Sequence, residues 1–144
     1  MFVLDTNVIS ELRSGKPNPS SAVLEWAAST VLSSHYLTSV TVYELEVGVL
    51  QLERRKQGNG IRQWLEAVKS TFRGRILPFG DDAAVACARM HVPNPKSFRD
   101  SMIAAIALES GLTVASRNLG DFAHTGVKLI NPWDHTGPMS PTNT

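Results

Sequence analysis

Short apolar runs alternate along the chain with longer stretches in which apolar side chains recur every three or four positions. The short runs predict strands near residues 2–4, 36–38, 75–77, 112–115 and 127–130. The longer stretches predict helices at residues 8–12, 20–30, 39–56, 61–72, 81–90 and 97–110. Strands that alternate with helices are typical of a parallel sheet covered on both faces. The predicted fold is therefore an α/β three-layer sandwich with a mostly parallel central sheet.

Several predicted helices have recognisable capping residues at their ends. Ser20 and Ser39 each precede a stretch with helical spacing, and a serine side chain at that position accepts a backbone N–H of the first turn. A further helix is expected to run from Ser97. Gly111 follows the helix at 97–110, in the position where glycine commonly ends a helix. These residues predict where the helices begin and end.

The length of 144 residues fits one domain with a hydrophobic core of its own. We assign residues 1–134 to this domain and residues 135–144, which are polar and include two prolines, to a flexible C-terminal tail. No apolar run is long enough to span a bilayer, and the first residues lack the pattern of a signal peptide. We therefore expect a cytoplasmic protein that does not contact a membrane.

Composition excludes several kinds of site. The single cysteine, Cys87, excludes an internal disulfide and a zinc site built from several thiolates. The four histidines are scattered, without the spacing of a zinc site. A net charge of +1 gives no strong global field, so nucleic-acid binding would depend on local clusters such as residues 54–56. Such basic runs are more often solvated helix faces.

Carboxylates recur where strands end or helices begin. Asp5 directly follows the first strand, and Asp121 follows the fourth. Glu44 lies within the apolar helix at 39–56, and Asp100 lies in the first turn of the helix at 97–110. A parallel sheet brings the carboxyl ends of its strands to one edge, where oxygen ligands of this kind suit Mg²⁺ or Mn²⁺. The pattern therefore predicts a metal-dependent phosphodiesterase.

Most of these carboxylates also have a structural explanation. Asp5 alone is most simply a helix cap, Asp100 a first-turn acid favoured by the helix dipole, and Asp121 a turn residue. Glu44 differs, because a charge among valines is costly unless a metal or another cation meets it. The functional interpretation depends on all four positions occurring together.

Four ordered motifs resemble those of PIN-domain ribonucleases, specifically the VapC or FitB type of toxin from bacterial type II toxin–antitoxin pairs. The motifs are residues 4–9, 39–49, 100–107 and 113–122, and residues 131–133 resemble a common ending of the family. The resemblance runs from Met1 to Trp133. It implies a PIN-like α/β sandwich, Mg²⁺-dependent (or Mn²⁺-dependent) endonucleolytic cleavage of RNA, homodimerisation and inhibition by a cognate antitoxin protein.

The matching positions give the expected site. Four acids would hold one or two metal ions and activate water: Asp5, Glu44, Asp100 and Asp121. Four further side chains would orient ligands or water: Thr6, Asn7, Ser116 and Asn118. Three arginines are candidate phosphate contacts on their chemistry alone, although any one of them is more often simply solvated at the surface: Arg13, Arg99 and Arg117.

The fourth motif departs from the family pattern. Ser116 stands where many relatives have threonine, which keeps the hydroxyl. Asn118 stands where some relatives have aspartate, so either Asp121 or Asn118 could complete the site.

Two other functions fit part of the pattern. A phosphotransferase of the haloacid dehalogenase kind also has an Asp after its first strand, but it needs a second Asp two residues later, where this chain has Asn7. The main alternative is a non-catalytic PIN-fold module that binds RNA or protein and keeps the acids only as caps. Metal titration would separate the two readings, and the RNA target cannot be read from these residues.

Overall fold

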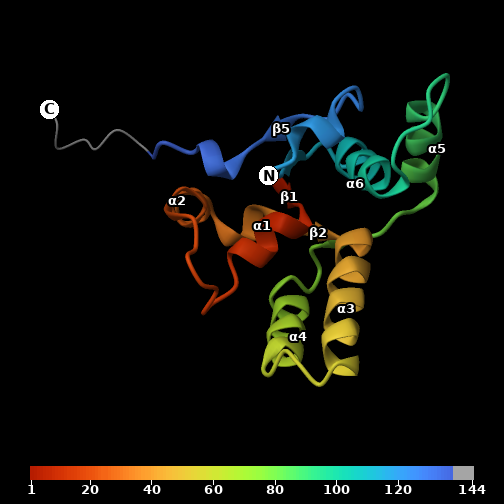
Figure 1. Cartoon of the computed structure of the whole chain (residues 1–144). Helices are drawn as coiled ribbons and strands as arrows, with labels where there is room; N and C mark the ends of the chain where they lie inside the picture. The colour runs from red at the N-terminus through yellow and green to blue at the C-terminus, as the bar shows by residue number, and fades with distance from the viewer. Residues whose placement is uncertain (138–144) are drawn as a thin grey trace, which may run out of the picture.

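The computed structural model describes residues 1–137 (Figure 1). Its strands are β1 (Phe2–Leu4), β2 (His35–Thr38), β3 (Ile76–Leu77), β4 (Thr113–Ala115) and β5 (Leu129–Ile130). Its α-helices are α1 (Thr6–Glu11), α2 (Ser21–Ser29), α3 (Ser39–Arg54), α4 (Ile61–Thr71), α5 (Asp81–Met90) and α6 (Phe98–Glu109). Three short 3-10 helices are η1 (Leu32–Ser34), η2 (Leu119–Phe122) and η3 (Pro132–Asp134). The predicted alternation of strands and helices is confirmed.

The strands form one sheet in the order β3-β2-β1-β4-β5, and every neighbouring pair is parallel. The predicted α/β sandwich is therefore confirmed. The first strand of the chain is the central strand, between β2 and β4. Because all strands run the same way, their carboxyl ends lie at one edge of the sheet. That edge is where the ends of β1 and β4 and the starts of the following helices meet.

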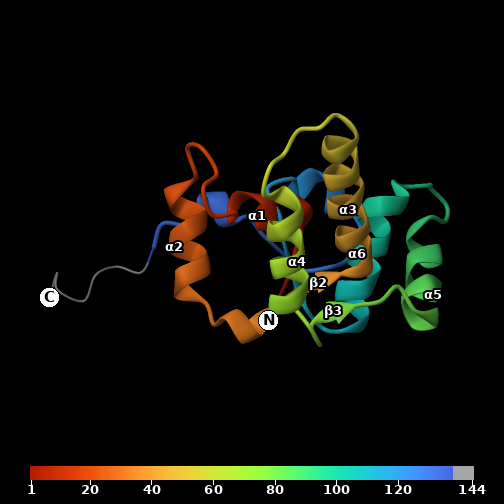
Figure 2. The ribbon, with the colours of Figure 1, turned by 90° about the horizontal axis from the view of Figure 1, so that it is seen from below.

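Helices cover both faces of the sheet. Val3 and Val114 belong to a core cluster with α5 and α6, whereas Leu4 and Ala115 belong to a second cluster with α1, α2 and α4. Successive side chains of a strand point to opposite faces, which explains this division. Figures 1 and 2 show α5 and α6 side by side on one flank of the molecule and α2 on the other.

Helix α6 lies close against the sheet because small residues face it. Ala104, Ala105 and Ala107 are fully buried. A helix that precedes a parallel strand begins at the carboxyl edge of the sheet and runs back to the opposite edge. The start of α6, with Asp100 in its first turn, is therefore held at the edge where β1 ends.

The predicted serine cap is confirmed at α2 and wrong at α3. The Ser20 hydroxyl accepts the Val23 N–H at 3.3 Å, and the Ser97 hydroxyl caps α6. At α3 the cap is Thr38 and not Ser39, since the Thr38 hydroxyl accepts the Thr41 N–H at 3.1 Å. The last residue of β2 thus caps the helix that follows it.

No helix within residues 1–137 is long and apolar enough to cross a membrane. Of the expected tail at 135–144, residues 138–144 lie outside the described part of the chain.

Candidate active site

Three carboxylates from three separate elements meet at one guanidinium. The Asp5 Oδ1 atom lies 2.6 Å from Nη2 of Arg99. Glu44 Oε2 accepts the Nε–H of the same arginine, and Asp100 Oδ1 accepts from its Nη1. Each carboxylate therefore pairs with a different nitrogen. The structure brings Asp5, Glu44 and Asp100 together at one edge of the sheet, as the sequence predicted.

Asp5 is fully buried at the end of the central strand. Its Oδ1 accepts the Thr6 N–H at 2.7 Å, and its Oδ2 accepts the Ser116 hydroxyl at 2.8 Å. Its own N–H donates to the Ala115 carbonyl at 2.9 Å, which extends the pairing of β1 with β4. Asp5 is thus both the cap of α1 and a member of the acid cluster.

Glu44 reaches the site from the second turn of α3. The Thr6 hydroxyl donates to Glu44 Oε1 at 2.7 Å, and Arg99 occupies the other oxygen. A carboxylate on this largely apolar helix was expected to need a cation, and the cation in this structure is an arginine. Thr6 therefore joins the start of α1 to α3 across the site.

The orienting residues lie on the β4 side of Asp5. The Asn7 side-chain amide donates to the Ser116 hydroxyl at 3.3 Å, and its carbonyl accepts the Arg117 N–H at 3.3 Å. Ser116 in turn accepts the Asn118 N–H at 3.0 Å. The structure thus brings the predicted Thr6, Asn7 and Ser116 side chains into contact with the acids, but Asn118 takes part through its backbone.

Asp121 does not pair with Arg99 as the other three acids do. It is exposed on η2, and within residues 1–137 its carboxylate forms no hydrogen bond or ion pair with another side chain. The side chain of Asn118 is exposed as well. The fourth position of the predicted site is therefore not assembled around the guanidinium.

Arg99 is the residue whose position sequence reasoning did not predict. It was expected to contact phosphate, and it instead pairs with three carboxylates of its own chain. Burial would lower the pKa of its guanidinium, but the hydrogen bond to Glu44 and the charge of Asp5 outweigh burial and raise that pKa above its usual range. The one sequence signal was the adjacency of a cation to Asp100 at a helix start, which is common on solvated helices too.

The donor atoms of the cluster suit a hard divalent cation, because all are oxygens and three are carboxylates. Their arrangement in this structure, however, is not that of a metal site. Among the described residues, no three His, Cys, Asp or Glu side chains are placed so that together they could hold a metal ion. The chemistry of the residues fits Mg²⁺ or Mn²⁺, while their spacing is set by the guanidinium between them.

The rim of the site carries a second arginine. The Arg117 guanidinium lies over the Trp133 ring, 5.2 Å from its centroid, and its side chain is exposed beside Asn7. This stacking fixes the position of the Arg117 side chain, while the three acids pair with Arg99.

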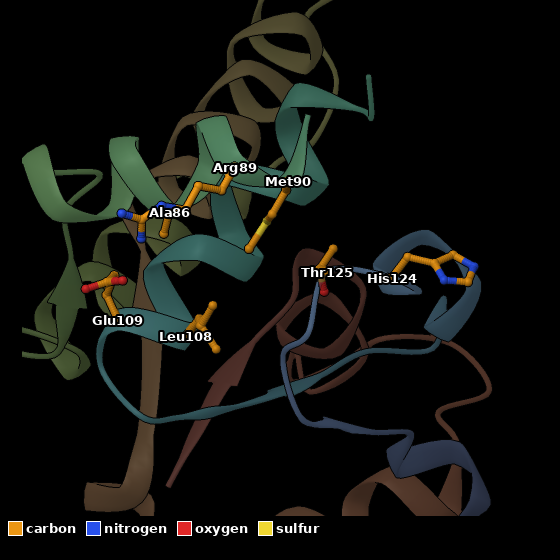
Figure 3. A pocket seen from close by; sticks show the side chains of 7 residues that line it. All are labelled: Ala86, Arg89, Met90, Leu108, Glu109, His124 and Thr125. Atoms are coloured by element: carbon orange, nitrogen blue, oxygen red, sulfur yellow. The ribbon is translucent and has the colours of Figure 1, made fainter. Parts of the chain in front are cut away.

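A pocket of about 260 Å³ lies elsewhere, between α5, α6 and the segment after η2 (Figure 3). Figure 3 shows Leu108 and Glu109, at the end of α6, on one wall and His124 and Thr125 on the other. Asp100 is at the opposite end of α6, a helix of 12 residues that spans roughly 18 Å. This pocket is separate from the acid cluster.

Comparison with known proteins identifies the family. The sequence profile of the PIN domain matches residues 2–128. This chain belongs to the PIN-domain family. It is 38% identical over 139 residues to Toxin FitB of Neisseria gonorrhoeae, covering 92% of this chain and 99% of that protein. It is 37% identical over 140 residues to the VapC ribonuclease Y4jK of Sinorhizobium fredii, covering 93% and 99%.

A solved structure agrees with this PIN domain along nearly its whole length. The crystal structure of FitAcB from Neisseria gonorrhoeae superposes with a TM-score of 0.84 at 38% identity, covering 93% of this chain and 99% of that one. The resemblance predicted from the four motifs, to PIN domains of the VapC and FitB type, is thereby confirmed.

Proposed function

We propose that this PIN domain is a metal-dependent endoribonuclease and the toxin of a toxin–antitoxin pair. The observation that carries the proposal is the meeting of Asp5, Glu44 and Asp100, from three separate elements, at the carboxyl edge of the sheet. Two relatives support the reaction and the role, since one is named a ribonuclease and the other a toxin.

The chain's own residues divide the chemistry between them. Asp5, Glu44 and Asp100 would hold Mg²⁺ or Mn²⁺, and the Asp5 carboxylate is oriented for this by Ser116 and Thr6. A bound divalent ion supplies Lewis-acid chemistry, which makes an attacking water more acidic and offsets charge on the phosphodiester.

Two exposed groups follow β4 along the chain, and we propose that they act on the substrate. The stacked Arg117 guanidinium is suited to contact an RNA phosphate, which would align the chain across the site. Asp121 is exposed on η2 and would join the other acids only when the substrate or a metal ion is bound.

The experiment is cleavage of total small RNA by the purified protein with Mg²⁺ or Mn²⁺. Discrete fragments that disappear with EDTA and in Asp100→Asn are the expected result. Asp134→Asn is a matched control on an exposed acid of η3, and it should cleave like the wild type. Wild-type activity in a folded Asp100→Asn protein would remove Asp100 from the site.

The non-catalytic alternative makes a different prediction for the same samples. If the acids served only as caps, calorimetry would detect no Mn²⁺ binding up to millimolar concentrations and no RNA would be cut. Cleavage that persists in EDTA would instead support the nuclease activity and refute its dependence on metal.

We further propose two protein partners, a cognate antitoxin and a second copy of this chain, in keeping with the toxin relative. An apolar pocket of about 310 Å³ between α1, α4 and the start of β2 offers a surface for the antitoxin, with Ile9, Leu12, Leu32 and Trp64 among its lining. Co-expression followed by size-exclusion chromatography tests both. Elution of the mixture at the mass of the free protein would refute binding of the antitoxin. Elution of the protein alone at 15.7 kDa would refute formation of a homodimer.

A further inference from the structure

We propose that Arg99 is an internal antagonist of the metal ion: its guanidinium holds the three acids in a closed arrangement and must leave before a divalent cation can bind. This inference rests on the proposed function, because it concerns the same three carboxylates. It adds a competitor for them that the chain itself supplies.

The pairing geometry shows why both cations cannot be bound at once. Asp5, Glu44 and Asp100 each pair with a different nitrogen of Arg99, so the three nitrogens of the guanidinium separate the three carboxylates. A small cation such as Mg²⁺ needs its oxygens at about 2.0–2.1 Å from a single centre. The oxygens must therefore move inward to a position that the guanidinium now fills.

The same geometry explains why the described residues show the right donor atoms without a ready metal site. Three carboxylates brought together without a cation would repel one another, and one of them, Asp5, is fully buried. Arg99 removes this repulsion at the cost of metal affinity. If only a fraction of the molecules has the open site, the apparent affinity for the metal equals the intrinsic affinity multiplied by that fraction.

Arg99 can leave by rotating its own side chain. Its side chain is 32% exposed, compared with 26% for Glu44, 14% for Asp100 and 1% for Asp5, so the arginine is the most exposed member of the cluster. It is rooted in the first turn of α6, one position before Asp100. A guanidinium displaced from this place remains at the rim, where an RNA phosphate would pass.

The chain offers a matched control in Arg62. This arginine also bridges three carboxylates, those of Glu46, Glu53 and Glu66, on the exposed faces of α3 and α4. The Arg62 cluster has no fully buried acid, and within residues 1–137 its hydrogen bonds and ion pairs all join residues of α3 and α4. Arg62→Gln therefore removes an arginine with the same number of acidic partners but leaves the site intact.

The first test measures Mn²⁺ binding by calorimetry in the full-length protein. We expect Arg99→Gln to bind Mn²⁺ at least ~5-fold more tightly than the wild type, the lower end of typical coupling between two ligands. Arg62→Gln should bind like the wild type. Without metal, Arg99→Gln should melt at a lower temperature, and saturating Mn²⁺ should raise its Tm more than that of the wild type.

A conservative variant covers the case in which Arg99→Gln fails to fold. Arg99→Lys keeps the charge, but one ammonium group cannot serve three carboxylates as the planar guanidinium does. Its Mn²⁺ affinity should lie between those of the wild type and Arg99→Gln. A lysine variant that binds Mn²⁺ no more tightly than the wild type would count against the proposal.

The second test follows the arginine itself. In ¹⁵N-labelled protein, the Arg99 Nε–H resonance, assigned by its loss in Arg99→Lys, should shift on titration with diamagnetic Mg²⁺, while the Arg62 resonance stays in place. An Arg99 resonance that does not move while calorimetry records bound Mg²⁺ would overturn the proposal.

The outcomes separate this inference from the proposed function. If all proteins bind Mn²⁺ equally and cleave RNA only with metal, the inference is refuted and the function stands. Tighter binding in Arg99→Gln with no RNA cleavage by any protein would support the competition and refute the nuclease. If none binds Mn²⁺, both the competition and the metal-dependent reaction are refuted.

Discussion

At the scale of single residues, Asp5 shows that capping and cation binding are not exclusive. Its carboxylate caps α1 through the Thr6 N–H and pairs with Arg99 at the same time. The sequence predicted the positions of Asp5, Glu44 and Asp100 because strand ends and helix starts are local features. It did not predict Arg99 as their partner, because a side chain's choice between solvent and a distant carboxylate depends on tertiary packing.

Ser116 supports Asp5 through its hydroxyl, which is fully buried. It donates to Asp5 at 2.8 Å and accepts the Asn118 N–H at 3.0 Å. We expect Ser116→Ala to lower the free energy of unfolding by about 1–3 kcal/mol, because it leaves buried polar groups without partners. Cleavage should fall with it. Urea denaturation and RNA cleavage measure the two effects.

The matched variant is Ser116→Thr, which keeps the hydroxyl and should retain stability and cleavage. Equal losses in the threonine and alanine variants would mean that packing at this position, and not the hydroxyl, is what matters.

His35 gives the fold a dependence on pH. Its imidazole is buried, stacks on Trp26 and lies 2.6 Å from the Thr30 hydroxyl. Burial, and then the positive charge of Arg75, lower the pKa of His35 below its ordinary value of 6.5. The unfolded chain therefore binds this proton more readily, and the stability from the neutral imidazole is present above pH 6.5 and lost as pH falls below it.

Thermal melts of the wild type and His35→Gln between pH 5 and 8 test this expectation. The wild type should lose Tm below about pH 6.5, the ordinary pKa of histidine, and the glutamine variant should lose less over the same window. Parallel curves for the two proteins would assign the acid sensitivity to other groups.

At the scale of elements, helix boundaries were predictable to within a residue or two where a single hydroxyl is available, as at Ser20 and Ser97. Where Thr38 and Ser39 are adjacent, both can cap, and the choice depends on where β2 ends. The Ser39 hydroxyl instead accepts the Phe79 N–H at 3.3 Å, a contact made across 40 positions of sequence. Local sequence carries no information about such a contact.

The start of α6 is fastened by a chain of hydrogen bonds. The Lys96 N–H donates to His91 Nδ1 at 3.3 Å, which leaves Nε2 to donate to the Ser101 hydroxyl at 2.8 Å. Ser101 in turn donates to the Ser97 carbonyl at 2.6 Å. The His91 ring also stacks on Phe98, with centroids 5.2 Å apart. This network fixes the loop that leads to Arg99 and Asp100.

We expect His91→Phe to keep the stacking and lose both hydrogen bonds of the ring, lowering the free energy of unfolding by about 1–3 kcal/mol. Hydrogen exchange should quicken at residues 96–101. Because His91 and Ser101 act through one bond, His91→Phe combined with Ser101→Ala should cost less than the two single losses added together. Full additivity in urea denaturation would contradict the network.

At the scale of the whole molecule, the net charge of +1 leaves RNA binding to a few local charges. Arg117 follows β4 at the carboxyl edge of the sheet, where its N–H donates to Asn7, whereas Arg73 precedes β3 at the opposite edge. Of the two, only Arg117 is placed to meet a phosphate at the site.

Arg117→Gln should weaken RNA binding and reduce the slope of log K against log salt concentration by about 1, the effect of one lost phosphate contact. Arg73→Gln should leave both unchanged. Fluorescence anisotropy over a salt series measures the slopes, and equal slopes for the wild type and Arg117→Gln would exclude the contact.

The sequence predicted the layers and the parallel sheet, because alternating elements admit few arrangements. It also predicted that acids from distant segments would share one edge. Asp121 marks the limit of this reasoning. Its place after β4 put it at the expected edge, but in the conformation of η2, which the sequence did not reveal, its side chain is exposed and does not pair with Arg99.

The central position of β1 has a consequence for synthesis of the protein on the ribosome. The partner strand that completes the pairing of β1 is β4, and the two strands pair in the register Phe2 with Thr113 to Leu4 with Ala115. The nascent chain must therefore emerge almost entirely before Asp5 has Ser116 beside it and Arg99 in front of it. A chain that stalls before β4 emerges cannot assemble the acid cluster, so the cluster forms only once synthesis of the protein is nearly finished.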